Sequence, residues 1–278
     1  MNYKIIADSS SNRFYMKGVP YATVPLKIVT QAKEYVDDEN LNVPEMVEEI
    51  LRQSGRSGSS CPNVQEWLEA FGDADCIFAV TITSNLSGSY SAAMQARKEY
   101  LSLHPEAKVC VLDSLSTGPE MLLIIEKLHQ YIQAGKSFEE IESQIRAYMQ
   151  HTHLLFTLKS LTNLARNGRV NPAMTAIAGA LGIYVVGRAS DEGTLEQMHK
   201  CRGERNSLKT TLSAMKKLRF SGGKVRIDHC LNPEAATQLR SMILQEYPEC
   251  DVQIGTCSGL CSFYAEKGGF LVGFEAGQ

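Results

Sequence analysis

Short apolar runs alternate with helix-forming segments along the first half of the chain. Residues 4–7, 76–80 and 109–112 have the length and composition of buried strands. Apolar-periodic segments predict helices at 43–52, 64–71, 92–101, about 118–134 and about 137–150. This alternation predicts an α/β fold with a parallel sheet in the N-terminal half.

All three predicted strands run into turns rich in serine and aspartate. The turns begin at Asp8, Thr81 and Asp113. Open α/β sheets bind ligands outside the carboxyl ends of their strands. The turn from Thr83 to Ala93 also leads directly into a helix, where free backbone N–H groups and the helix dipole favour an anion. We therefore expect an anion-binding site at this edge of the sheet.

Three further segments complete the first half. Residues 21–29 are predicted to form one strand with Pro25 at an edge-like position, and 34–37 a short hairpin arm. Residues 55–62 are predicted to form a loop of glycine, serine and cysteine before the helix at 64–71. This loop is either a second hydroxyl-lined helix entry or a flexible linker.

The pattern changes after residue 158. We predict short helices at 161–169 and 173–181, a hairpin of strands 183–187 and 195–200 with its turn at 191–193, and helices at 206–218 and 233–245. Strands are expected at 224–230, 252–254 and 270–274. The prediction is thus two domains, an α/β domain over 1–158 and an α+β domain over 159–278.

Composition narrows the class of protein. The 278 residues are 44% hydrophobic and 21% charged, with a net charge of −3, which is typical of a globular protein and gives no case for nucleic-acid binding. No signal peptide opens the chain, and no apolar run is long enough for a membrane span, so we expect a cytoplasmic protein.

The eight cysteines are expected to be reduced thiols. Cys76, Cys110 and Cys230 lie in strand-like runs and are expected to be buried. Cys61 and Cys257 lie in loops that we expect to face the ligand.

Several kinds of catalytic or metal chemistry fit the sequence poorly. His151 and His153 could share one face of a strand, but no third ligand lies nearby, so no metal is expected. The hydrolase motif Gly-x-Ser-x-Gly is absent, and no histidine spacing argues for a triad with His199 or His229. Cys61 at a helix entry would suit a thiol enzyme, but no histidine partner can be assigned. A dinucleotide oxidoreductase needs glycines after the first strand, and none are present.

What remains is a binding protein for a small anion with an apolar body. Hydroxyls and backbone N–H groups would hold the anionic group, Arg169 would lend charge, and apolar side chains would enclose the rest.

The turn after the strand at 76–80 reads Thr83-Ser84-Asn85-Leu86-Ser87-Gly88-Ser89-Tyr90. This segment, which we call the signature turn, is similar to the Ser-Ser-x-Leu-Ser-Gly-Thr-Tyr signature of the DegV family, and the resemblance to that family covers essentially the whole chain. Ser59-Ser60-Cys61-Pro62 stands where the family usually has Thr-Ser-Gln-Pro. The order and spacing of 111–114, of 161–169 and of Gly255-Thr256-Cys257-Ser258-Gly259 also fit.

The resemblance implies a two-domain protein that buries a long-chain fatty acid between its domains. It also implies that a dihydroxyacetone-kinase-like fatty-acid kinase phosphorylates the bound acid, while the protein itself carries the ligand without catalysis and needs no cofactor. By position, Ser84 would bind the carboxylate and Ser59 or Ser60 would act as the family's Thr-Ser pair. The rest of the implied binding set is Asn85, Ser87, Gly88, Arg169, Thr256 and Cys257.

Two departures bear on this expectation. Cys257 stands where the family usually has histidine, and Cys61 where it has glutamine. Either hydroxyls and backbone groups hold the carboxylate here, or the ligand's head group differs. The alternatives are an enzyme, such as a hydrolase, acting on a lipid-like substrate in the same cleft, or an interaction scaffold without a closed apolar cavity.

Overall fold

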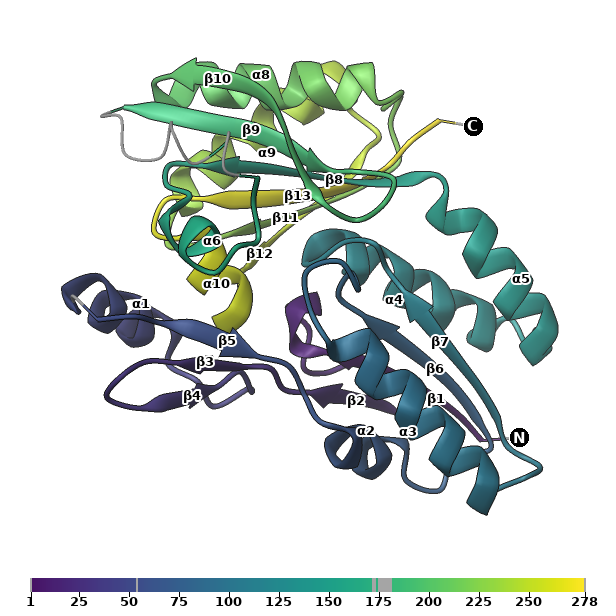
Figure 1. Cartoon of the computed structure of the whole chain (residues 1–278). Helices are drawn as coiled ribbons and strands as arrows, with labels where there is room; N and C mark the ends of the chain where they lie inside the picture. The colour runs from purple at the N-terminus through teal and green to yellow at the C-terminus, as the bar shows by residue number, and fades with distance from the viewer. Residues whose placement is uncertain (1, 54, 172–173, 175–181, 278) are drawn as a thin grey trace.

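The computed structural model describes residues 2–53, 55–171, 174 and 182–277, and its strands form three sheets (Figure 1). The first sheet is parallel and has the strand order β2-β1-β6-β7. Its strands are β1 (Tyr3–Asp8), β2 (Tyr21–Val24), β6 (Cys76–Thr81) and β7 (Lys108–Asp113). The prediction of a parallel sheet in the N-terminal half is confirmed.

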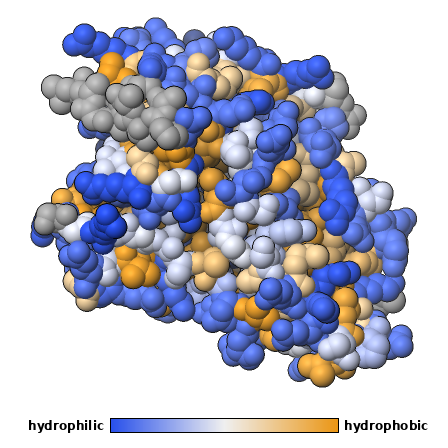
Figure 2. Space-filling model, in the orientation of Figure 1, coloured by the Kyte–Doolittle hydropathy of each residue, from blue (hydrophilic) through white to orange (hydrophobic). Residues whose placement is uncertain are grey.

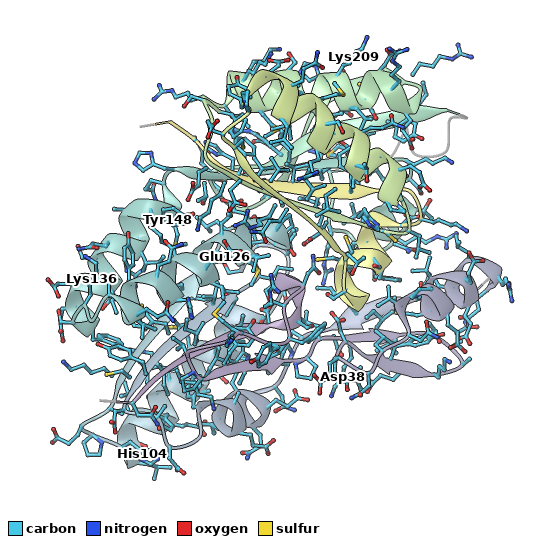
Figure 3. The ribbon with its side chains drawn as sticks, turned by 180° about the vertical axis from the view of Figure 1, so that it is seen from behind. Asp38, His104, Glu126, Lys136, Tyr148 and Lys209 are labelled. Atoms are coloured by element: carbon cyan, nitrogen blue, oxygen red, sulfur yellow. The ribbon has the colours of Figure 1, made fainter. Side chains whose placement is uncertain are left out.

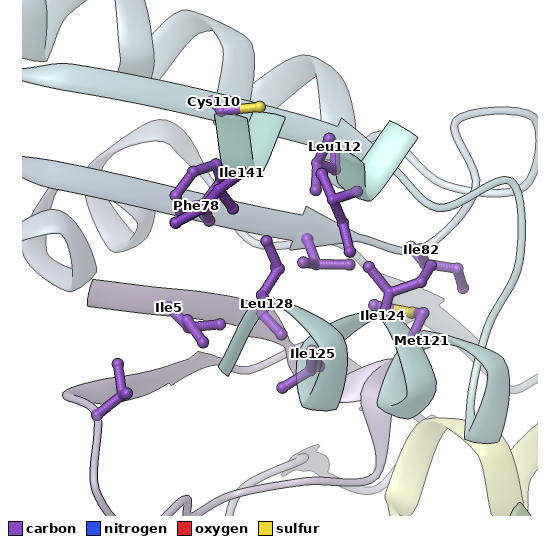
Figure 4. Close-up of a cluster of buried hydrophobic side chains, with 14 of the residues drawn as sticks. Ile5, Phe78, Ile82, Cys110, Leu112, Met121, Ile124, Ile125, Leu128 and Ile141 are labelled. Carbon is purple, nitrogen blue, oxygen red and sulfur yellow. The ribbon is translucent and has the colours of Figure 1, made fainter. Parts of the chain in front are cut away.

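Helices cover both faces of this parallel sheet, because successive strand side chains point to opposite faces. On one face, Phe78 and its neighbours pack against α4 (Pro119–Gln133) and α5 (Phe138–Met149), as Figure 4 shows. On the other face, Ile77 and Ala79 pack against α2 (Val64–Phe71) and α3 (Ser89–Leu103). With both faces covered, the sheet is open only at its edges and strand ends.

The second sheet is mixed and has the order β10-β9-β8-β13-β11-β12. Its strands are β8 (Thr152–Leu158), β9 (Ile183–Ala189), β10 (Leu195–Arg202), β11 (Lys224–His229), β12 (Asp251–Thr256) and β13 (Phe270–Glu275). Apolar side chains of α8 (Glu204–Lys217) and α9 (Pro233–Glu246) pack on one face. The predicted hairpin of the second half is confirmed as β9 and β10.

The junction between the two sheets is tightly packed along α4. At Gly273 of β13, an added Cβ would lie 2.4–2.6 Å from backbone atoms of Pro119 and Glu120, so the helix rests directly on the strand. Seen from behind, Glu126 and Tyr148 lie where α4 and α5 meet the second sheet (Figure 3). Glu126 forms an ion pair with Arg226 at 2.8 Å, and the Tyr148 hydroxyl donates to Glu275 at 2.7 Å.

The third sheet is antiparallel, and only its hairpin arm at 34–37 was expected from the sequence. It has the order β4-β3-β5 and consists of β3 (Lys27–Val29), β4 (Glu34–Val36) and β5 (Gly58–Ser60). The prediction of a single strand over 21–29 is therefore wrong, because this segment divides at Pro25 into β2 of the first sheet and β3 of the third. Pro25 has no N–H to donate, and the N–H of Leu26 donates to the Ser9 hydroxyl at 3.0 Å instead of to a neighbouring strand.

Other predictions had mixed outcomes. The loop predicted at 55–62 contains β5, and the segment before β13 contains an unpredicted helix, α10 (Gly259–Ala265). The helices α1 (Val43–Arg52) and α6 (Thr162–Arg166) confirm two predictions, and a 3-10 turn, η1 (Ser9–Ser11), follows β1. The helix predicted over 173–181 lies outside the described residues except for Met174. The domain boundary at 158 stays a prediction, although β8 pairs with β9 and β13 of the second sheet.

Candidate functional site

A cavity of about 300 Å³ lies between the strand ends of the first sheet, α10 and the second sheet. Apolar residues gather in the hollow between the two halves of the molecule in Figure 2. The lining residues are Leu26, Ser59, Ser60, Cys61, Ile82, Leu86, Ser87, Gly88, Thr117, Leu154, Phe156, Leu158, Leu164, Arg169, Leu195, Leu260, Cys261, Tyr264, Ala265 and Leu271.

The body of the cavity is apolar for a simple structural reason. Leu154, Phe156 and Leu158 alternate along β8 and therefore face the same side of the second sheet. Leu271 from the neighbouring strand β13 and Leu260 from α10 extend the same wall. A cavity lined in this way favours an apolar ligand.

Polar groups come from segments that are distant in the sequence. Ser59 and Ser60 arrive on β5, and the Ser59 hydroxyl lies 2.7 Å from that of Tyr264 on α10. Ser87 and Gly88 come from the turn between β6 and α3. Arg169 is the one charged side chain among the described lining residues, and its Nε donates to the carbonyl of Leu86 at 3.0 Å. The guanidinium is thus held beside the Ser87–Gly88 turn.

The entry to α3 is suited to a negative charge. Gly88 is the N-cap of this 15-residue helix and has no side chain of its own to cap it, and in the first turn the N–H of Ser89 donates to the Ser87 hydroxyl at 3.3 Å. The first-turn N–H groups and the positive end of the helix dipole therefore face the same turn as Ser87 and Arg169. The cavity thus combines an apolar body with a polar region that favours an anion.

The buried carboxylate of Asp8 accepts hydrogen bonds from both ends of this turn. Asp8 is fully buried and accepts hydrogen bonds from the N–H of Ile82 at 2.9 Å and the hydroxyl of Ser89 at 2.6 Å. Burial raises the pKa of Asp8, while its hydrogen bonds act in the opposite direction. Asp8 lies outside the lining and positions the two ends of the turn, a role that the sequence analysis missed.

Only part of the predicted binding set reaches the cavity. Ser59, Ser60, Ser87, Gly88 and Arg169 line it. Whether these side chains bind a ligand stays a prediction.

Ser84 and Asn85 lie outside the lining, on the exposed side of the same turn. The backbone N–H of Ser84 donates to Asp113 at 3.1 Å, and the side-chain amide of Asn85 donates to the carbonyl of Glu192. Their roles as ligand contacts also stay predictions.

The expected burial of Cys76, Cys110 and Cys230 is confirmed, but Cys257 does not line the cavity as expected. Cys61 is exposed and lines the cavity, but Thr256 is exposed elsewhere and Cys257 is buried outside the lining. Burial raises the pKa of the Cys257 thiol well above its ordinary value, so this thiol stays protonated. Cys261, four residues later and on α10, is the second cysteine of the lining. Its spacing to Leu260 and Tyr264 is the helical signal that could have identified it.

Groups for acid–base or metal chemistry are scarce in the part of the chain that the structure describes. Its cavity lining contains no histidine, aspartate or glutamate that could act as a general base for a hydrolase. The His153 ring is tilted against that of Phe274, with 5.6 Å between the ring centroids, and burial lowers the pKa of its imidazole. Within the same residues, no group of three or more histidine, cysteine or acidic side chains could hold a metal ion. Nor is any described helix both long and apolar enough to cross a membrane.

Fold and site together define an α/β protein of three sheets, with an apolar cavity and a polar, anion-favouring region where the sheets meet. The model of the DegV family, which is described as uncharacterised, matches residues 2–276. A DegV domain-containing protein of Streptococcus pneumoniae is 40% identical over 279 residues, 99% of each chain. The chain belongs to the DegV family, as the resemblance predicted.

Two solved structures are similar to this protein over essentially its whole length. A DegV family protein from Eubacterium eligens loaded with heptadecanoic acid is 45% identical, with a TM-score of 0.97, over 99% of this chain and 100% of that one. The Streptococcus pneumoniae Fatty Acid Kinase (Fak) B3 protein loaded with linoleic acid is 40% identical, with a TM-score of 0.98, over 100% of both chains. The mixed α/β fold agrees with the two-domain prediction.

Proposed function

We propose that this protein binds a long-chain fatty acid in the cavity between its sheets and presents it to a fatty-acid kinase. The observation that carries the proposal is the apolar cavity whose described lining has a single charged side chain, Arg169, beside the Ser87–Gly88 turn. An acyl chain matches the apolar body, and a carboxylate matches the polar region. Two close relatives that were solved with fatty acids support the same ligand class.

The carboxylate would lie against Ser87, Gly88 and Arg169, with Ser59 or Ser60 completing its hydrogen bonds. Ser84 is three residues from Ser87 but on the exposed side of the turn, so the geometry favours Ser87 as the direct contact. Cys257 is buried outside the lining. Its substitution for the family's histidine would therefore leave the head group to hydroxyls, backbone N–H groups and Arg169.

The protein would act as a carrier, with catalysis supplied by a kinase of the dihydroxyacetone-kinase type. The absence of a general base among the described lining residues favours this assignment over a hydrolase. Phosphorylation requires that the carboxylate be reachable from outside, and the exposure of Ser60, Cys61 and Gly88 places the polar region at the protein surface. We place the presentation of the fatty acid to the kinase in the cytoplasm and assign no cofactor besides the bound ligand.

Native mass spectrometry followed by denaturing extraction tests the proposal. A stoichiometric fatty acid in the purified protein, or its uptake from solution, is the expected result. Protein that is empty and takes up no added fatty acid would refute it.

A pair of variants tests the placement of the carboxylate. Ser87→Ala should weaken fatty-acid binding about tenfold to a hundredfold, because a hydrogen bond to a charged group contributes about 1.5–3 kcal/mol. Ser84→Ala should have the smaller effect in the same titration. A larger loss in Ser84→Ala would restore the sequence-based assignment of the carboxylate contact.

A further inference from the structure

The turn between β9 and β10 reaches from the second sheet to the signature turn of the first. In Figure 1 this turn extends below the second sheet toward the N-terminal half of the chain. The hydroxyl of Thr83 donates to the carbonyl of Gly193 at 2.9 Å, and the side-chain amide of Asn85 donates to the carbonyl of Glu192. Thr83 and Asn85, two positions apart, thus bind two consecutive carbonyls across the junction.

The fit at this contact depends on a glycine. Gly193 has a φ of +77°, and a Cβ added there would lie 2.2 Å from the Thr83 hydroxyl and 2.9 Å from the Cα of Leu115. The hairpin turn itself is rigid, because the Ser190 hydroxyl accepts the N–H of Thr194 at 3.0 Å and the Gly193 N–H donates to the Ser190 carbonyl at 2.9 Å. The β9–β10 turn can therefore bind to Thr83 and Asn85, or separate from them, as a unit.

Both partners of this contact carry part of the cavity wall. Leu195 follows directly after the hairpin turn, and Leu86, Ser87 and Gly88 follow directly after Asn85. On its other side, the signature turn is held by the bond from Arg169 to the Leu86 carbonyl. The turn that carries Leu86 and the hairpin turn before Leu195 are joined by the two neutral hydrogen bonds of Thr83 and Asn85, and such bonds individually contribute little to stability.

We propose that Thr83 and Asn85 are positioning residues that hold this wall shut, and that release of the β9–β10 turn opens the path by which the ligand enters and leaves. The inference rests on the proposed function for the identity of the ligand. It assigns Asn85 to the hairpin turn in place of the carboxylate. Opening breaks the bonds to Glu192 and Gly193 and leaves both sheets intact.

Stopped-flow binding of cis-parinaric acid, a fluorescent fatty acid, tests the proposal. Asn85→Ala and Gly193→Ala should raise the association and dissociation rates together, by about tenfold, which is the change expected from the loss of one hydrogen bond. The equilibrium affinity should change by less than about threefold, because an easier opening speeds both directions. Glu192→Ala is the matched control, since it keeps the accepting carbonyl, and should exchange as wild type does.

Two results would overturn the proposal. A faster dissociation with an unchanged association rate in Asn85→Ala would identify Asn85 as a direct ligand contact, and unchanged rates in both variants would show that the turn does not gate the cavity. If Gly193→Ala does not fold, Asn85→Asp, which places an acceptor against the Glu192 carbonyl, replaces it. If wild-type protein takes up no cis-parinaric acid, the proposed function fails, and the same rates measured with the amphipathic anionic dye anilinonaphthalene sulfonate decide on the gate alone.

Discussion

The hydrogen bonds between Asp37 and the first turn of α10 give the sharpest test of how the cavity wall is built. Asp37 follows β4 directly and is fully buried. One of its carboxylate oxygens accepts the N–H of Gly259 at 2.6 Å, and the other accepts the N–H of Leu260 at 3.0 Å. The carboxylate therefore satisfies first-turn donors of the helix that brings Leu260, Cys261 and Tyr264 into the lining.

Replacing Asp37 by alanine should cost about 1–3 kcal/mol of unfolding free energy. Two buried backbone N–H groups lose their partners, and each such loss costs about 1–3 kcal/mol. Burial raises the pKa of Asp37 to about 6, so the charge itself is unfavourable at this site, and its removal offsets part of the loss. The unfolding free energy of Asp37→Asn should lie between those of wild type and Asp37→Ala, because one amide oxygen cannot replace two acceptors.

Urea unfolding at pH 7.5, followed by circular dichroism and by the fluorescence of the single tryptophan, Trp67, measures this loss. Asp38→Ala is the matched control, since among the described residues its half-buried carboxylate accepts only the N–H of Asn40, at 2.8 Å, and the substitution should cost less than about 1 kcal/mol. The affinity for cis-parinaric acid should also fall in Asp37→Ala. A loss of stability no larger than that of the control would refute the reasoning.

Two further predictions concern the junction between the sheets. Burial raises the pKa of Glu120 to about 7, so the folded protein binds this proton more tightly than the unfolded chain, and the resulting stability is full below about pH 4.5 and is lost as the pH rises through 7. Glu120→Gln, which keeps an acceptor for the Thr152 hydroxyl, should therefore exceed wild type by about 2–3 kcal/mol at pH 8 and by much less at pH 4.5 in urea unfolding, and an equal difference at both values would contradict this. Gly273→Ala should lower the unfolding free energy by about 3 kcal/mol, because its Cβ would meet the α4 backbone, and an unchanged melting temperature would show that the junction can yield.

The strand pattern was predictable where local sequence decides it. The apolar runs that became β1, β6 and β7 are buried on both faces, so their composition alone marks them. The run that became β5 was predicted as a loop, the run that became β3 was predicted only as part of one strand over 21–29, and each is only three residues long. They are strands because they pair with each other, with Ile28 opposite Ser59, and a pairing between distant segments leaves no mark in either segment alone.

The candidate site was predictable by segment but not by side chain. The signature turn and the serines of β5 were both identified, and the structure brings both to the cavity. Which hydroxyls point inward depends on the turn's backbone, so Ser87 reaches the lining and Ser84 does not. Cys261 lines the cavity and Cys257 does not, because Cys261 lies on α10, which contributes to the lining, whereas Cys257 precedes this helix.

The position of β13 has a consequence for how the protein is made. Although β13 is the last strand in sequence, it lies in the interior of the second sheet, between β8 and β11. During synthesis, β8 to β12 therefore emerge from the ribosome as two groups that share no edge, and Leu271 is missing from the wall. A nascent chain that has not reached Phe270 has no closed cavity, so the capacity to hold a ligand arises late in synthesis and in one step.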